Sequence, residues 1–424
     1  MAALTLAAGP LRAEDGRLEI SQSQLPYAIT QPGSYVVTDD LVSNSNNTPM
    51  ISIQASFVTL DLNGHRLLQE HNAPVIRSTN SARFVTVRNG RVRSAYAQDL
   101  GLELDSAFNR IEDIECIGFY DVGLYASDHT LVRDCRVREG AYGYSGIRVG
   151  PGSLVARSAV GRSVGSGLGV GITGNTGLLV ADCSVSDWTS DIAGAIFFGI
   201  SAAGGVVIAD SRVSSNVLAA GGTVQAMDLR SGGVVSRCAV QGNRDEHTNS
   251  LGIIAHDAWV IADCSVEGRG HAGVAVSNGS VVARNTLYGP NCDIQAGAGC
   301  LVRDNALREG GINVGESCLV AGNSVRRETF MNALILLSGG GYALQNNLWG
   351  WDTAGIQVVG KNSRVDRNNI STFTDIRVDL GSSNLIVRNR FNAMTIIASN
   401  DFVGASLAGG VDMSANLPWA NIDW

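Results

Sequence analysis

The sequence predicts an all-β fold, a solenoid of parallel β-coils. A short motif recurs along the chain: two apolar residues, a polar pair, and then Cys, Asn or Ser, as in Leu131–Cys135 and Leu179–Cys183. A period of this kind is typical of solenoids. The intervals, 18 to 28 residues, are too short for a strand–helix–strand unit, which needs about 30. The 51 glycines among 424 residues also argue against long helices.

The last position of the motif can be followed through about fourteen coils, and we expect it to face inward and stack on itself. Asn side chains in such a column can form an amide ladder, and Cys or Ser can fill a tight corner. Because in-register pairs on neighbouring parallel strands have poor disulfide geometry, we expect mostly free, buried thiols. The positions of this column are Asn89, Ile114, Cys135, Ser158, Cys183, Ser211, Cys238, Cys264, Asn285, Asn305, Asn323, Asn347, Asn368 and Asn389.

Each interval carries a second strand, usually opened by Gly, as in Gly146–Gly150 and Gly273–Ser277. Apolar and variable residues alternate in these segments with period two, which indicates strands. Asn and Gly at the corners fit turns that need positive φ. Three short strands and their turns therefore account for each coil.

The ends of the chain lack this period. Residues 1–13 resemble the end of a secretory signal peptide, which predicts a secreted, periplasmic or cell-surface protein. Residues 14–50 are expected to cap the first coil, because a solenoid must cover its open edge. The solenoid itself is expected over 51–400, and 401–424 are expected to form a C-terminal cap or tail.

The Asn column and the segment Val58–His65 resemble the right-handed parallel β-helix superfamily, the pectate-lyase-like fold, over about residues 50–400. The resemblance implies one right-handed β-helix, and it favours an exported bacterial enzyme acting on a polysaccharide. The superfamily contains lyases, hydrolases, epimerases and adhesins, so the fold alone does not choose the reaction.

Composition narrows the classes of partner. The net charge of −8 argues against nucleic acid. No apolar stretch is long enough to span a membrane. The single lysine, Lys361, means that arginine, histidine or tyrosine would have to act as a catalytic base in place of lysine. There is no Cys-x-x-Cys or His-Glu-x-x-His metal motif, although scattered carboxylates could hold calcium. The oligomeric state is left open.

The candidate site lies on the longest coils, between 183 and 264, because extra length in a solenoid forms loops on its binding face. Ten residues before the column stand Tyr125, Arg148 and Asp228, and eight before it stand Arg230 and His256. Parallel-strand spacing would bring Asp228, Arg230, His256 and the adjacent Asp257 within about 5–10 Å of one another. Two loops would border this patch, with the residues Asp187, Trp188 and Asp191, and Arg244, Asp245, Glu246 and His247.

These residue types fit two kinds of polysaccharide chemistry. Asp228, His256, His247 and Arg230 are the acid–base candidates, and Arg148 and Arg244 could bind a sugar carboxylate. The carboxylates of Asp187, Asp191, Asp245, Glu246 and Asp257 would contact substrate, and Tyr144, Trp188 and Trp351 could stack on sugar rings. We expect a polysaccharide lyase or a glycoside hydrolase acting in a groove. The alternative is a non-catalytic carbohydrate-binding or adhesin protein, in which the same polar groups form a solvated, salt-bridged face.

Overall fold

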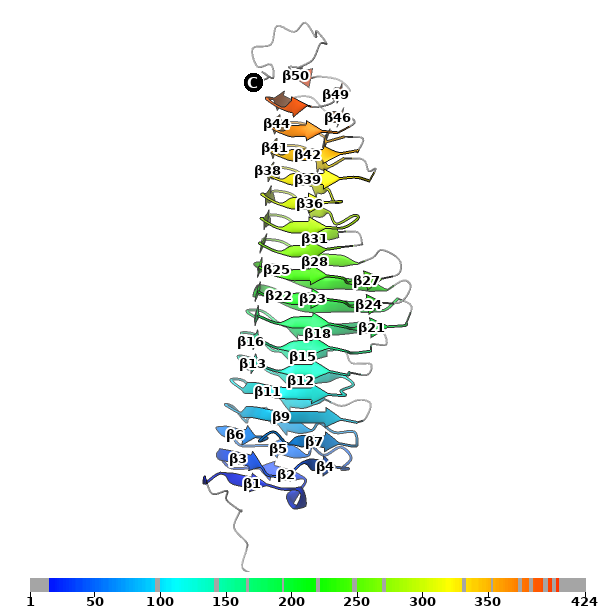
Figure 1. Ribbon diagram of the computed structural model, residues 1–424. Coiled ribbons are helices and arrows are strands. Elements are labelled where there is room, and N and C mark those ends of the chain that lie inside the picture. The colour runs from blue at the N-terminus through cyan, green and yellow to red at the C-terminus, as the bar shows by residue number, and fades with distance from the viewer. Residues whose placement is uncertain are drawn as a thin grey trace, which may run out of the picture. The chain divides into compact units, whose positions relative to one another are not determined.

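The computed structural model is all-β, with 57% strand, and winds into a parallel β-solenoid of about 14 turns (Figure 1). Its described residues contain one short 3₁₀ helix, η1 (Gln22–Gln24), and no α-helix. The chain divides into two compact units, residues 1–190 and 191–424, which are treated separately below. The structure describes residues 15–95, 100–140, 145–164, 168–192, 194–218, 222–245, 250–268, 272–329, 333–351, 354–372, 376–380, 384–391, 396–398 and 402–403.

Each turn of the first unit contributes to three faces, which we call A, B and C. Face A contains β2 (Tyr27–Ile29), β5 (Ile51–Ile53), β8 (Ile76–Ser78), β10 (Leu102–Leu104), β12 (Val122–Ala126), β15 (Ser145–Val149) and β18 (Leu168–Gly174). Face B contains β1 (Leu18–Ile20), β3 (Gly33–Val37), β6 (Val58–Asp61), β13 (Leu131–Arg133), β16 (Leu154–Ala156) and β19 (Leu179–Ala181). Face C contains β4 (Leu41–Ser43), β7 (Arg66–Gln69), β14 (Arg136–Arg138), β17 (Ala159–Gly161) and β20 (Ser184–Ser186), while β9 (Thr86–Ser94) and β11 (Arg110–Ile117) run from face B into face C. The short β21 (Thr189–Ser190) ends the unit.

The second unit repeats this order. Face A contains the first parts of β22 (Ile196–Ala209) and β25 (Thr223–Ser236), then β28 (Leu251–Ala255), β31 (Ala272–Val276), β34 (Ile294–Ala296), β37 (Ile312–Val314), β40 (Ile335–Leu337), β43 (Ile356–Val359), β46 (Ile376–Leu380) and β49 (Ile396–Ala398). Face B contains the second parts of β22 and β25, then β29 (Trp259–Ala262), β32 (Val281–Ala283), β35 (Leu301–Arg303), β38 (Leu319–Ala321), β41 (Tyr342–Leu344), β44 (Arg364–Asp366), β47 (Asn384–Val387) and β50 (Phe402–Val403). Face C contains β23 (Arg212–Ser214), β26 (Ala239–Gln241), β30 (Ser265–Glu267), β33 (Thr286–Tyr288), β36 (Ala306–Arg308), β39 (Ser324–Arg327), β42 (Asn347–Gly350), β45 (Asn369–Ser371) and β48 (Arg390–Phe391). The short β24 (Val217–Leu218) and β27 (Arg244–Asp245) pair outside these faces.

The core consists of the inward residues of each strand, stacked rung upon rung. In the first unit Ile111, Val132, Val155 and Val180 occupy one such column, and all four are fully buried. Burying a side chain of this size stabilises the fold by about 1.5–3 kcal/mol. The regular column explains why the period of the sequence is visible without any helical segment.

The Asn ladder is confirmed in the second unit, with one correction. Six asparagines lie inward, and the side-chain amide nitrogen of each of the first five donates to the side-chain oxygen of the next over 2.9–3.0 Å: Asn285, Asn305, Asn323, Asn346, Asn368 and Asn389. Asn346 therefore takes the place that the sequence had given to Asn347, which is exposed on β42. In the first unit the residue in register with Ile114 is Gly90 rather than Asn89. All eight cysteines are buried, and none of them forms a disulfide.

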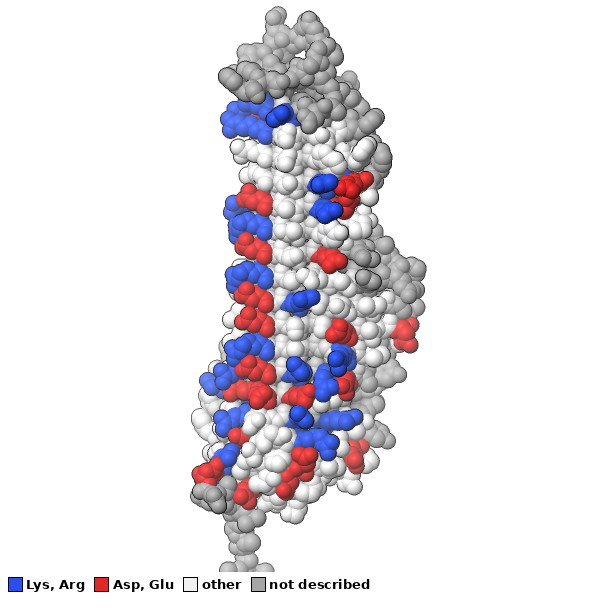
Figure 2. Space-filling model, viewed as in Figure 1, with Lys and Arg blue, Asp and Glu red and all other residues white. Residues whose placement is uncertain are grey.

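The corner between faces B and C carries exposed, oppositely charged residues. Arg157 pairs with Asp134 in the first unit (Nε–Oδ1 2.7 Å), and Arg237 with Asp210 in the second (2.7 Å). All four residues have positive φ, between 46° and 57°. Figure 2 shows blue and red side chains alternating along one side of the molecule. Each pair joins successive turns, but exposed pairs of this kind add little to stability because water and salt screen them.

Residues 14–50, predicted to form a cap, include strands already paired in parallel with later turns. Leu18 of β1 lies in register with Tyr35 of β3, and Tyr27 of β2 with Ile51 of β5. Their role as a cap stays a prediction. The segments 1–14 and 404–424 lie outside the described residues.

Candidate functional site

The acid–base patch predicted from the sequence lies on face A of the second unit. Asp228 stands in register with Ile254, and the backbone amide of His256 donates to the carbonyl of Leu229 over 2.9 Å. Arg230 and His256 therefore follow paired residues on adjacent strands, as the repeat count predicts. Within the described part of the chain, the side chains of Asp228, Arg230 and His256 form no hydrogen bond or ion pair.

His256 borders a shallow hollow of about 250 Å³ with Ala275, Gln295 and Asn313 along its length. No carboxylate lines this hollow in the described residues. The neighbouring Asp257 has a structural contact, because its Oδ1 accepts a hydrogen bond of 2.9 Å from the backbone amide of Asn278. The patch thus combines the half-buried Asp228 with the exposed Arg230 and His256 beside a slight depression, and its catalytic role stays a prediction.

Much of the predicted loop border cannot be placed. Glu246, His247 and Tyr144 lie outside the described residues, and Arg244 and Asp245 are described only in their backbone, as β27. Asp191 is exposed at the start of the second unit. Their contribution to a substrate site stays a prediction.

The structure corrects the role of Trp188. Its side chain is only 1% exposed, and its indole packs against the backbone of Gly169, where an added Cβ would lie 2.7 Å from the ring. A buried ring has no face available for a sugar, so Trp188 belongs to the core of the first unit. Trp351 in the second unit is 59% exposed, and its ring is accessible as expected.

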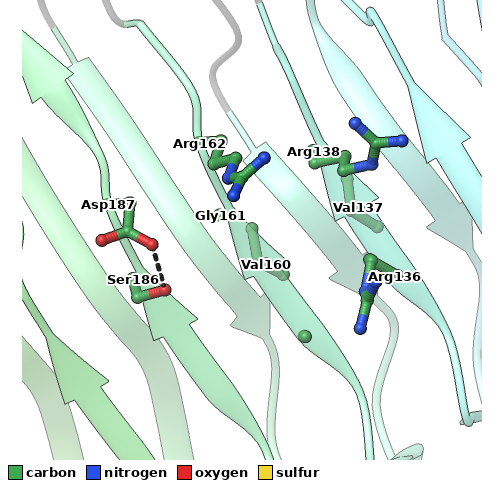
Figure 3. A pocket seen from close by; sticks show the side chains of 9 residues that line it. Arg136, Val137, Arg138, Val160, Gly161, Arg162, Ser186 and Asp187 are labelled. Carbon is green, nitrogen blue, oxygen red and sulfur yellow. Dashed lines mark hydrogen bonds between the residues drawn. The ribbon is translucent and has the colours of Figure 1, made fainter.

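Asp187 lines a hollow of about 470 Å³ on face C of the first unit (Figure 3). Ala159 and Gly161 of β17 line it, and neither carries a group larger than a methyl that could fill the depression. Figure 3 shows Ser186 and Asp187 on one side of β17, and Arg136 and Arg138 of β14 on its other side. Ser186 Oγ donates to Asp187 Oδ2 over 3.0 Å, so this carboxylate is partly engaged. The hollow is lined by Arg136, Val137, Arg138, Ala159, Val160, Gly161, Arg162, Ser186 and Asp187.

A second group of polar residues occupies face A of the same unit. Arg77, Glu103, Tyr125 and Arg148 stand in register on β8, β10, β12 and β15, one residue from each successive turn. Neighbouring parallel strands lie about 4.8 Å apart, so the four side chains form a row across four rungs. We call these residues the face A row.

Glu103 is the most constrained member of the face A row. It points outward from the strand, yet it is only 6% exposed. Arg77 Nη2 donates to Oε1 over 3.2 Å, and Arg77 Nε lies 2.8 Å from Oε2. Burial, followed by the negative charge of Asp105, raises the pKa of Glu103 to about 7, and Arg77 only partly opposes this. Such a carboxyl can hold or release a proton near neutral pH.

Tyr125 lies between Glu103 and Arg148 in the row. Burial raises the pKa of its phenol above the usual value of 10, with smaller contributions from Asp105 and Glu103 in the same direction and from Arg148 in the other. The phenol is therefore a proton donor at neutral pH. Arg148 is exposed, with a 3.4 Å hydrogen bond to Ser145 Oγ. The row thus combines a proton acceptor, a proton donor and two guanidinium groups.

Sequence reasoning included Tyr125 and Arg148 in its outward column but missed Glu103, Asp105 and Arg77. A fixed count of ten residues back from the inward column fails here, because Glu103 lies eleven residues before Ile114, whereas Tyr125 lies ten before Cys135. A count that allows the length of the corner between faces A and B to vary by one residue would have included Glu103.

No family model matches the chain, and no curated protein does. Among solved structures, the A-module of a mannuronan C-5 epimerase from Azotobacter vinelandii is similar at 10% identity over 86% of this chain and 92% of that one, with a TM-score of 0.31. A periplasmic alginate epimerase is similar at 12% identity over 88% and 83%, with a TM-score of 0.26. A tailspike of the E. coli bacteriophage HK620, solved with a pentasaccharide, is similar at 10% identity over 85% and 72%, with a TM-score of 0.26. Likenesses this remote carry no argument about the site.

No helix among the described residues has the length and hydropathy needed to cross a membrane. No group of three or more His, Cys, Asp and Glu side chains in the same residues could hold a metal ion. The calcium that the sequence left open therefore has no assigned position.

Proposed function

We propose that this protein is a carbohydrate-active β-helix that cleaves a uronic-acid-containing polysaccharide by β-elimination at the face A row. The observation that carries the proposal is the outward but buried carboxyl of Glu103, held between Arg77 and Tyr125 on adjacent rungs. A carboxyl in this setting can change its protonation state during a reaction near neutral pH, which an ordinary surface glutamate cannot do.

The row supplies the groups that β-elimination needs. The guanidinium of Arg148, and that of Arg77, would neutralise the substrate carboxylate and stabilise the negative charge that develops when C5 loses its proton. Ionised Glu103 would accept the C5 proton. The electron pair of the C5–H bond would form the C4–C5 double bond, the C4–O4 bond would break, and Tyr125 would donate its proton to O4. Proton and charge balance without a further co-reactant.

The patch of Asp228, Arg230 and His256 is the second candidate for the acid–base centre, now on face A of the second unit. The observation in its favour is that none of the three side chains has a partner among the described residues. Export of the protein, predicted from residues 1–13, belongs to the same proposal.

The test is a screen of the purified protein against soluble polyuronates and neutral polysaccharides, with calcium present. Absorbance of the unsaturated product and the number of reducing ends would be followed together. We expect both to rise on a polyuronate, and we expect Glu103→Gln and Tyr125→Phe to lower kcat by about 10²-fold or more, as for removal of a general acid or base.

Matched variants separate the two candidate centres. Asp228→Asn and His256→Gln should leave the rate within about twofold if the face A row is the centre, and should abolish it if the second-unit patch is. Reducing ends that rise without the unsaturated product would indicate a hydrolase. Silence on the whole panel would overturn the enzymatic proposal and favour the non-catalytic alternative.

A further inference from the structure

Face C of the second unit carries an exposed aromatic and arginine column that the proposed elimination does not use. In register on successive strands stand Tyr288 (β33), Arg308 (β36), Arg326 (β39), Trp349 (β42) and Ser371 (β45). Tyr288 is 49% exposed and Trp349 is 39% exposed, although rings of this size usually bury most of their surface. We call these five residues the face C column.

Arg326 covers one face of the Trp349 ring, and no ring contact is formed on the other face by the residues that the structure describes. The guanidinium carbon of Arg326, on the preceding rung, lies 4.8 Å from the ring centroid, an arrangement that fixes the ring's orientation. On the following rung the residue in register is Ser371. Its small side chain cannot cover an indole. The second ring face therefore looks onto a hollow of about 520 Å³ that Trp349 and Ser371 both line.

The rest of that hollow is polar and carries amides. Asn369 Nδ2 donates to Asn347 Oδ1 over 2.9 Å. This bond leaves the side-chain nitrogen of Asn347 and the side-chain oxygen of Asn369 without a hydrogen-bond partner in the described part of the chain. A donor and an acceptor thus lie side by side next to an open aromatic face, which suits the ring and hydroxyl groups of a sugar.

The charge of the hollow favours an uncharged sugar. Among the described residues that line it, the charged one is Arg326, and Arg326 Nη2 is already 2.9 Å from Glu328 Oε1. This hollow therefore has little net positive charge to attract an anion. This setting contrasts with the face A row, where exposed Arg148 has no carboxylate within salt-bridge distance among the described residues.

We propose that the face C column of the second unit is a binding site for an uncharged polysaccharide, with a sugar ring stacked on the open face of Trp349 over Ser371 and its hydroxyl groups bonded to Asn347 and Asn369. Tyr288 lies three rungs away in the same column, about 14 Å from Trp349 by strand spacing, so only a longer chain would reach it. The site is separate from the proposed catalytic residues and does not depend on the elimination reaction.

The test is native affinity electrophoresis of the full chain in gels containing a soluble β-glucan, a galactomannan, a xylan or, for comparison, a polyuronate. We expect at least one neutral polysaccharide to retard the protein. Trp349→Ala should weaken this retention at least tenfold. Ser371→Phe should do the same, because a larger side chain would cover the open ring face while Trp349 stays in place.

Three controls make the result decisive. Tyr342→Ala removes an aromatic ring on face B that is about as exposed as that of Trp349. The neutral polysaccharide should retard this variant as strongly as the unaltered protein. The gel should also retard Glu103→Gln normally. A loss of the proposed enzymatic activity can therefore be distinguished from a loss of binding at the face C column. Circular dichroism would show whether each variant is folded. If Trp349→Ala does not fold, the retention of Ser371→Phe tests the proposal instead. Retention by no neutral polysaccharide, retention by the polyuronate alone, or unchanged retention of the folded variants would overturn the proposal.

Discussion

Arg77 donates a hydrogen bond of 3.2 Å from Nη2 to Oε1 of Glu103, and yet the pKa of this glutamate is raised to about 7. Burial of the carboxyl outweighs the nearby positive charge, and the negative charge of Asp105 adds to the burial effect. An ion pair in this position therefore costs stability when the carboxyl ionises, in line with the general weakness of buried pairs.

The first prediction follows from this balance and concerns stability. Because the folded pKa of Glu103 lies above its ordinary value of 4.5, the folded chain binds more protons than the unfolded chain between about pH 4.5 and 7. The free energy of unfolding should therefore fall as the pH rises through this window, by up to about 3 kcal/mol. Glu103→Gln should remove this fall, being more stable than the unaltered protein at pH 8 and no more stable at pH 4. Urea unfolding of both proteins across this range measures the effect, and parallel curves would contradict it.

The second prediction concerns the pH dependence of activity on the polysaccharide that the screen identifies. If ionised Glu103 accepts the substrate proton, kcat/KM should rise through about pH 7, because the group must lose its own proton first. Asp105→Asn removes the negative charge that helps raise this pKa and should move the rising limb to lower pH. A limb that stays in place in Asp105→Asn would show that another group controls it.

The third prediction uses two neighbouring asparagines at the start of β42, of which one faces the core and the other is exposed. Asn346 is 1% exposed, and its amide donates to Asn368 Oδ1 and to the carbonyl of Val320, whereas Asn347 is exposed. Asn346→Ala should leave buried ladder partners unsatisfied and lower the free energy of unfolding by about 2–4 kcal/mol. Asn347→Ala should change it by less than about 1 kcal/mol. Chemical unfolding of the two variants distinguishes them, and equal losses would refute the assignment of Asn346 to the ladder.

The fold was predictable because the same pattern of apolar and polar residues repeats with nearly one period along the chain. Inward positions such as Val132 and Val155 repeat at each turn, so counting residues was enough to find the strands and the ladder. Counting assigned the wrong residue to the inward column where a turn gains or loses one residue, as at Gly90 and Asn346. Side chains alternate between the two sides of a strand, so an error of one residue exchanges an inward position for an outward one.

The candidate site was less predictable, for a reason visible at Trp188 and Glu103. The sequence gives no measure of how a side chain is covered by neighbouring turns. Trp188 occupies a loop rich in polar residues, yet it is buried, and Glu103 points outward, yet its neighbours exclude water. Arg230 and His256 directly follow residues that are paired on adjacent strands, as expected, but burial and pKa depend on contacts between coils that the sequence does not show.

The fourth prediction concerns the exposed charge pairs at the corner between faces B and C. Arg157 and Arg237 hold the pKa values of Asp134 and Asp210 below the ordinary 3.8, chiefly through side-chain hydrogen bonds. Because the folded pKa values are lowered, the stabilisation is present above about pH 4 and is lost as the pH falls through the folded values. Arg237→Gln should thus lower the melting temperature slightly at pH 7 and low salt, and no longer do so at pH 2. Since exposed pairs are screened, the difference should also vanish in about 1 M salt. Calorimetry under the three conditions tests this, and a loss that persists at pH 2 or in high salt would mean that Arg237 stabilises the corner by packing and not by charge.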